Sequence, residues 1–205
     1  MRRTKEDAEK TRISILKAAL KVFYAKGVSR ATLSDISKAA GLSRGAIHWH
    51  FRDKSDLFLQ LYDYMSEKTP LRARPWSDES IQTLDELKQV LLAGLESYFT
   101  DREVRRFLIV IFSRMEYIAE FDELCNHELA YQQKSVRELE QVYERLRSAG
   151  EIHEWISPYF AARHTYIFID GMIDCLSIND ETFLTKDQLA AAVNEFFRLF
   201  DMPSG

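Results

Sequence analysis

The chain has few glycines, prolines and cysteines, and it has no long apolar run. Seven Gly and four Pro in 205 residues argue against an all-β sandwich or barrel with many turns. Cys125 and Cys175 lie far apart in apolar helical patterns, so we expect buried free thiols in a reducing compartment. The longest clear apolar run is FLIVIF at 107–112, far short of the ~20 residues that span a bilayer. Because the first residues are strongly charged and unlike a signal peptide, we expect a cytoplasmic protein with no membrane partner.

Sequence motifs of catalysis are also missing. There is no G-x-S-x-G, no phosphate-binding loop and no H-E-x-x-H. His48 and His50 are two residues apart, so they diverge around a helix and cannot share a metal ion. We therefore expect no enzyme activity, no metal site and no cofactor, although histidines and carboxylates distant in sequence can still meet after folding.

Charge is distributed unevenly along the chain. The net charge is −4, but residues 1–55 carry 13 Lys/Arg against 5 Asp/Glu, whereas residues 56–205 carry 15 against 27. A basic N-terminal block on an acidic body indicates that one end meets a polyanion and the other does not. An accidental segregation of charge is the alternative.

Helical periodicity dominates the sequence, and we expect an all-α fold of about nine helices. The expected helices span residues 10–26, 33–40, 44–51, 54–69, 78–99, 101–115, 122–149, 158–178 and 186–200. Segment 70–77 contains two prolines and is the clearest linker, and Thr100 with Glu103 forms a capping-box pattern before the sixth helix. We predict two domains, a smaller one over residues 1–55 and a larger one over residues 56–205.

Residues 32–54 have the pattern of a helix-turn-helix. Thr32 precedes Asp35 by three residues as in a capping box, and Gly41 suits the left-handed end of a helix. Ser43 can cap the second helix, on which Ile47 and Phe51 share an inward face. The opposite, polar face is free to enter the major groove of DNA.

Several residues of this unit suit DNA contacts. Arg44 can bond bidentately to guanine, and Gly45 lets the backbone approach the duplex closely. Hydroxyls and free N–H groups at Thr32 and Ser43 suit phosphates, and Lys54 is a further phosphate contact.

The quoted residues also carry a family resemblance. GLSRGAIHWHFRDKSDLF at 41–58 resembles the end of the helix-turn-helix of TetR-family bacterial repressors, in particular those that control multidrug efflux. RRTKEDAEKTRISILKAAL at 2–20 and FYAKGVSRATLSDI at 23–36 are similar to that family as well. The close likeness covers about the first sixty residues, and beyond them it is one of helix lengths and order.

The resemblance implies roles for single residues. It implies that Arg44, Gly45, His48 and Trp49 lie near bases or backbone, and that His50 and Lys54 contact phosphates. The sequence departs from the family at His48, where Tyr is usual, so the contact made there differs. Two alternatives remain, in which Trp49 packs against the next helix and His50 has a capping or core role.

The resemblance also implies a homodimer that binds a small molecule. Residues 1–55 would then be the DNA-binding domain, and residues 56–205 the ligand-binding and dimerisation domain. Helices near 158–178 and 186–200 are the expected dimer elements, since the first is apolar on more than one side; the alternative is that it is central within the monomer. Nine side chains are candidates for the ligand site: Met65, Phe99, Phe107, Ile111, Met115, Glu116, Gln132, Tyr166 and Asp170. The carboxylates favour a lipophilic, cationic guest, although most apolar members could simply form core and Asp170 could lie at the dimer interface.

These observations together predict a ligand-responsive transcriptional repressor. It would bind a pseudo-palindromic operator in double-stranded DNA and be released by the small molecule. Control of an efflux transporter follows from the resemblance alone. The alternatives are an architectural DNA-binding protein without an effector and an enzyme that uses the same fold.

Overall fold

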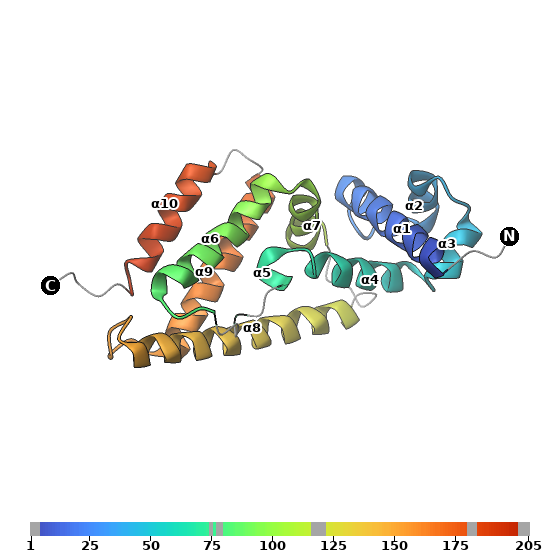
Figure 1. Cartoon of the computed structure of the whole chain (residues 1–205). Coiled ribbons are helices and arrows are strands. Elements are labelled where there is room, and N and C mark those ends of the chain that lie inside the picture. The colour runs from blue at the N-terminus through green and yellow to red at the C-terminus, as the bar shows by residue number, and fades with distance from the viewer. Residues whose placement is uncertain (1–4, 74–75, 77–79, 116–121, 180–183, 201–205) are drawn as a thin grey trace.

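The computed structural model describes residues 5–73, 76, 80–115, 122–179 and 184–200. Within these ranges every regular element is a helix, which confirms the expected all-α class. The helices are α1 (Lys5–Lys26), α2 (Leu33–Ala40), α3 (Arg44–His50), α4 (Lys54–Ser66), α5 (Pro70–Ala73), α6 (Leu84–Thr100), α7 (Arg102–Ser113), α8 (Asp122–Ala149), α9 (Pro158–Asn179) and α10 (Lys186–Phe197). Helices α1–α3 gather at one end of the molecule, while α6, α9 and α10 form the other end (Figure 1). No helix in the described part of the chain has the length and apolar character needed to cross a membrane.

The N-terminal helices bury one apolar face each against a shared centre. Ile36 of α2 and Ile47 of α3 are fully buried, and Phe51 closes the end of α3. Asp53 caps α4 by accepting a hydrogen bond from the backbone N–H of Asp56 at 2.8 Å. α4 then leads from the helix-turn-helix towards the rest of the molecule (Figure 1).

Helix α7 packs against α1 and joins the two ends of the molecule. The backbone N–H of Val28 donates to the carbonyl of Arg114 at 3.1 Å, and Lys17 pairs with Glu103 at 3.0 Å. The guanidinium of Arg106 lies over the ring of Tyr24. One connected cluster of buried apolar side chains extends from α1 to the end of α10.

Some expected boundaries are wrong for local reasons. Segment 70–77 contains the short helix α5, because Pro70 starts a turn in which the N–H groups of Arg72 and Ala73 both donate to the Thr69 carbonyl at 2.8 Å. The described chain therefore holds ten helices rather than nine. α4 ends at Ser66 rather than near residue 69, and α6 starts at Leu84 because Thr83 and Glu86 form a capping box.

The expected cap at Thr100 is also wrong. Thr100 lies inside α6 and its hydroxyl donates to the Glu96 carbonyl, whereas the Asp101 carboxylate caps α7. A charged oxygen accepts from the helix N-terminus more strongly than a hydroxyl, which explains the shift by one residue. Both cysteines are free thiols, and they are half-buried rather than buried.

Candidate DNA-reading helix and ligand cavity

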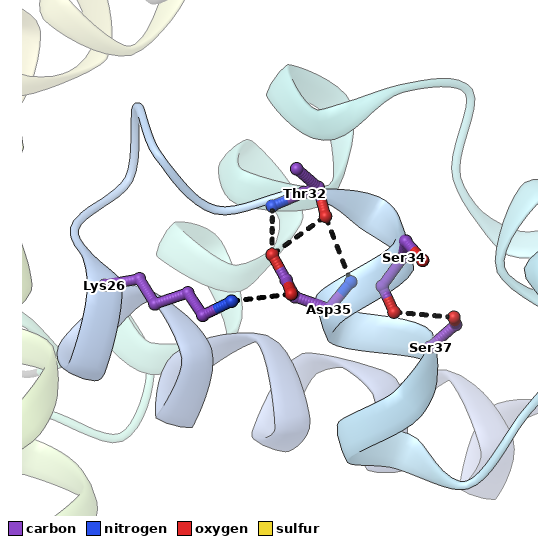
Figure 2. Close-up of polar contacts among 5 residues, drawn as sticks. All are labelled: Lys26, Thr32, Ser34, Asp35 and Ser37. Atoms are coloured by element: carbon purple, nitrogen blue, oxygen red, sulfur yellow. Dashed lines mark hydrogen bonds and ion pairs between the residues drawn. The ribbon is translucent and has the colours of Figure 1, made fainter.

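The start of α2 is fixed by a set of side-chain hydrogen bonds that Figure 2 shows. The Asp35 backbone N–H donates to the Thr32 hydroxyl at 3.1 Å, and the Thr32 N–H and hydroxyl donate to the Asp35 carboxylate. Lys26, the last residue of α1, donates to the same carboxylate at 2.6 Å. Hydrogen bonds from Lys26 and Thr32 lower the pKa of Asp35 to about 2. The capping box is therefore confirmed, and it also joins α2 to α1.

Helix α3 presents the predicted contact residues to solvent. Ser43 caps it by accepting from the Ala46 N–H at 3.2 Å. Arg44, Gly45 and His48 are exposed, and Trp49 is 71% exposed. The exposure of Trp49 argues against its packing on α4. The outer face of α3 thus combines a guanidinium, an imidazole, an indole and a glycine, as a major-groove reader requires.

Two of the predicted phosphate contacts, His50 and Lys54, are more enclosed than the outer face of α3. His50 is half-buried, and its ring lies edge-on to Trp49 with centroids 4.5 Å apart. Lys54 is half-buried as well, and its Nζ donates to the Ser29 carbonyl at 3.1 Å. Lys54 therefore ties the start of α4 to the turn between α1 and α2, a role that the sequence does not indicate.

A small cavity lies among α5, α6, α7, α8 and α9. Its wall combines aromatic and aliphatic side chains with a few polar groups, and these are Thr69, Leu71, Arg72, Trp76, Gly94, Leu95, Tyr98, Leu108, Phe112, Tyr131, Tyr166, Ile169, Asp170, Ile173 and Leu176. The open space is about 30 Å³, close to the share of one water molecule in the liquid. A drug-sized guest needs about 300 Å³ or more, so side chains must move before one can enter.

Two of the nine predicted ligand residues, Tyr166 and Asp170, line this cavity. Burial and the negative charge of Glu128 raise the pKa of the Asp170 carboxyl, with Arg72 acting in the opposite direction. Gln132 lies with Tyr166 on an open groove of about 590 Å³ between α8 and α9, outside the cavity.

The other predicted ligand residues are placed elsewhere. Met65, Phe107, Ile111 and Met115 are buried in the apolar core without lining the cavity, and Phe99 is half-buried beside Tyr98. Glu116 lies outside the described residues.

Sequence reasoning missed Arg72, Trp76 and Tyr131, which belong to the cavity wall. Arg72 and Trp76 occur in the segment interpreted as a linker, and Tyr131 lies one position from the predicted Gln132. Their signal is weak, because a linker pattern gives no indication that its side chains will point inward. No group of three His, Cys, Asp or Glu side chains able to hold a metal ion occurs in the described ranges.

The fold and the exposed reading helix define a helix-turn-helix regulator with an all-helical body. Residues 15–61 match the family model of bacterial regulatory proteins, tetR family. TtgR of Pseudomonas putida, an HTH-type transcriptional regulator, is 31% identical over 179 residues, which are 84% of this chain and 83% of its own length. The chain belongs to the TetR family.

Two further relatives support this assignment. AcrR of Shigella flexneri is 40% identical over 121 residues, which cover 58% of this chain and 56% of the relative. In Pseudomonas aeruginosa, NalD, the secondary repressor of the MexAB-OprM multidrug efflux pump, has a structure that matches with a TM-score of 0.80 at 30% identity, over 98% of this chain and 100% of that one. These relatives regulate transcription and are not enzymes, as the sequence predicts.

Proposed function

We propose that this protein is a repressor that binds a pseudo-palindromic operator in the cytoplasm and is released by a lipophilic cation. The observation that carries the proposal is the exposed face of α3, which belongs to the basic N-terminal block of residues 1–55. Residues 1–55 would read DNA, with Thr32, Ser43, His50 and Lys54 on the backbone and Arg44, Gly45, His48 and Trp49 at the groove. Residues 56–205 would bind the effector and the second subunit.

The wall of the cavity supports the proposal that the effector is a cation. Asp170 is a half-buried carboxylate in a wall that also contains Tyr131, Tyr166 and Trp76. Aromatic faces and a partly desolvated carboxylate both attract an organic cation. Control of an efflux transporter is supported by the likeness to NalD.

Dimerisation is supported by apolar side chains that α9 and the end of the chain expose. Phe160, Ile167 and Ile178 lie on one side of α9 and are 58%, 67% and 63% exposed. Leu199, just after α10, is 63% exposed, and stacking of Phe168 on Phe196 holds α9 and α10 together. A second copy would cover these residues and place two reading helices ~34–36 Å apart.

The test uses fluorescence anisotropy to measure how tightly the protein binds labelled DNA taken from upstream of its gene. We expect operator affinity well over ~100-fold above random DNA, a steep loss with salt, and dissociation on adding tetraphenylphosphonium. Tetraphenylborate, an anion of the same shape, is the control and should release less DNA. The small size of the cavity favours one alternative, a DNA-binding protein that needs no effector. Operator affinity that stays unchanged across a panel of lipophilic cations would support this alternative.

A further inference from the structure

Arg72 of α5 lies in a closed, charged and aromatic setting. Its side chain is 6% exposed, and its Nη2 pairs with the Glu128 carboxylate of α8 at 2.8 Å. Its Nη1 donates to the Tyr62 hydroxyl of α4 at 2.6 Å. The guanidinium carbon lies 4.4 Å from the ring centre of Tyr131 and 5.3 Å from that of Tyr62. We call these four residues, Tyr62, Arg72, Glu128 and Tyr131, the Arg72 cluster.

The partners of Arg72 form the kind of site that recognises an organic cation. A half-buried carboxylate and two tyrosine rings surround one positive group, and aromatic faces attract cations most strongly where water is excluded. Burial, the largest single influence, would lower the pKa of Arg72, but Glu128, Tyr62 and Tyr131 together outweigh it and raise that pKa, so the guanidinium stays charged. The cation site is therefore filled by a side chain of the protein itself.

Arg72 also belongs to the wall of the neighbouring cavity. The adjacent residue, Leu71, lies so close to Gly94 of α6 that a Cβ on that glycine would be 2.3 Å from the leucine side chain. Leu71 and Arg72 both line the cavity, with Asp170 on the same wall. The Arg72 side chain and the Asp170 carboxylate therefore border the same small cavity.

A second position for the guanidinium lies next to the first. A hollow of about 90 Å³ is lined by Arg72 and also by Ser135 and Glu138 of α8. The Glu138 carboxylate accepts from the Trp76 N–H at 3.1 Å, and its side chain is 15% exposed. Arg72 can thus leave Glu128 without becoming a buried charge that has no partner.

We propose that Arg72 is an internal competitor of the effector: a lipophilic cation takes its place at Glu128 and the tyrosine rings, and Arg72 moves towards Glu138. This rests on the proposed function and specifies how the same cavity responds. The exchange breaks the hydrogen bond to Tyr62 on α4, the helix that begins four residues after the last residue of α3. Loss of that bond is the step that links cation binding to the position of the reading helix.

The test compares binding of tetraphenylphosphonium and tetraphenylborate to the full-length protein by isothermal titration calorimetry. Arg72→Gln removes the competitor, so cation affinity should rise about tenfold if the closed form is populated about 90% of the time. Borate affinity should change by less than about twofold, because tetraphenylborate is an anion and does not compete with Arg72 for Glu128. Arg147→Gln, the same change at an exposed site in the last turn of α8, is the matched control and should leave both affinities unchanged.

The outcomes separate the two proposals. Unchanged cation affinity in Arg72→Gln, with clear binding by the wild-type protein, overturns the competitor role and leaves the repressor intact. Lost borate affinity in that variant also overturns it, because Arg72 would then recognise anions. If neither protein binds the cation, the cationic effector itself is refuted. If Arg72→Gln does not fold, Arg72→Lys replaces it in the test, because lysine keeps the buried charge but lacks the planar contacts of arginine. Cation affinity should then rise by a smaller factor in Arg72→Lys, and no rise contradicts the proposal.

Discussion

Arg44 is the side chain on which we expect operator choice to depend most. It is exposed in the first turn of α3, and its fork of donors matches the O6 and N7 acceptors of guanine. Arg52, just after α3, is exposed too, with a weak pair to Asp56 at 3.6 Å, but it lies beyond the reading face. Comparing variants of these two arginines therefore distinguishes base reading from general attraction to phosphates.

Arg44→Ala should reduce operator affinity by about 1–3 kcal/mol and random-DNA affinity by much less. Arg52→Ala removes the same charge and should weaken both kinds of DNA alike. For each variant, anisotropy titrations with operator and scrambled duplexes measure the ratio of operator affinity to random-DNA affinity. Equal ratios for the two variants would refute base reading by Arg44.

The position of a residue in the fold could be predicted from the sequence only where its own local segment determines that position. Arg44 and Ser43 occupy positions that the helix-turn-helix pattern defines, and the structure places both at the start of α3. Arg72 acts through Glu128, which lies 56 residues away, and no local pattern indicates that contact. Lys54 shows the same limit, since its bond to Ser29 depends on how α4 returns to the first turn.

At the scale of the element, the start of α2 should respond to acid. Hydrogen bonds from Lys26 and Thr32 depress the pKa of Asp35 to about 2, below an ordinary carboxyl at 3.8. A depressed pKa in the folded state stabilises the protein above about pH 4 and loses this contribution as pH falls towards 2. The difference in unfolding free energy between wild type and Asp35→Asn should shrink from pH 5 to pH 3 in urea titrations. A difference that stays constant with pH would contradict this contribution.

The contact between α5 and α6 gives a second prediction at this scale. Gly94→Ala would favour an isolated helix, but its Cβ would meet Leu71 at 2.3 Å, so we expect a loss of about 1–3 kcal/mol in unfolding free energy. The same substitution in a Leu71→Ala background should cost nothing. Gly45→Ala, where the nearest atom is 3.8 Å away, is the control and should not destabilise the free protein. Equal costs of Gly94→Ala in both backgrounds would contradict the contact.

The first residue of a helix was predictable where its capping hydrogen bond joins residues no more than three positions apart. Thr32 and Ser43 cap the helices that the sequence assigns to them, and Asp53 and Thr185 cap α4 and α10 by the same local hydrogen bond. The face of a long helix is harder, because it depends on partners distant in sequence. On α8, Leu129 is 51% exposed although it is apolar, whereas Leu139, Val142 and Tyr143 in the later part of the helix are buried.

At the scale of the whole molecule, the function we propose needs two copies of the chain. The helix-turn-helix and α9 lie towards opposite ends of the molecule (Figure 1). Two copies that associate through the exposed apolar residues of α9 would therefore leave the reading helices free. The domain boundary near residue 55 remains a prediction, since buried side chains continue from one part into the other.

Ile167→Glu should convert the dimer to a monomer, because a charge would be buried at the centre of the interface. Ile167 is 67% exposed on α9, so the variant should fold normally. Ala39→Glu, at an exposed position of α2, is the control and should remain dimeric. Sedimentation velocity measures both, and a dimeric Ile167→Glu would place the interface elsewhere.

The three tryptophans report on separate parts of the molecule. Trp49 is 71% exposed on the reading helix, Trp76 is 4% exposed in the cavity wall, and Trp155 is 76% exposed between α8 and α9 beside His153. Variants that keep one tryptophan and replace the others by phenylalanine would each emit from one location. Trp49 emission would follow DNA and Trp76 emission would follow the effector, so stopped-flow mixing would show which of the two sites responds first.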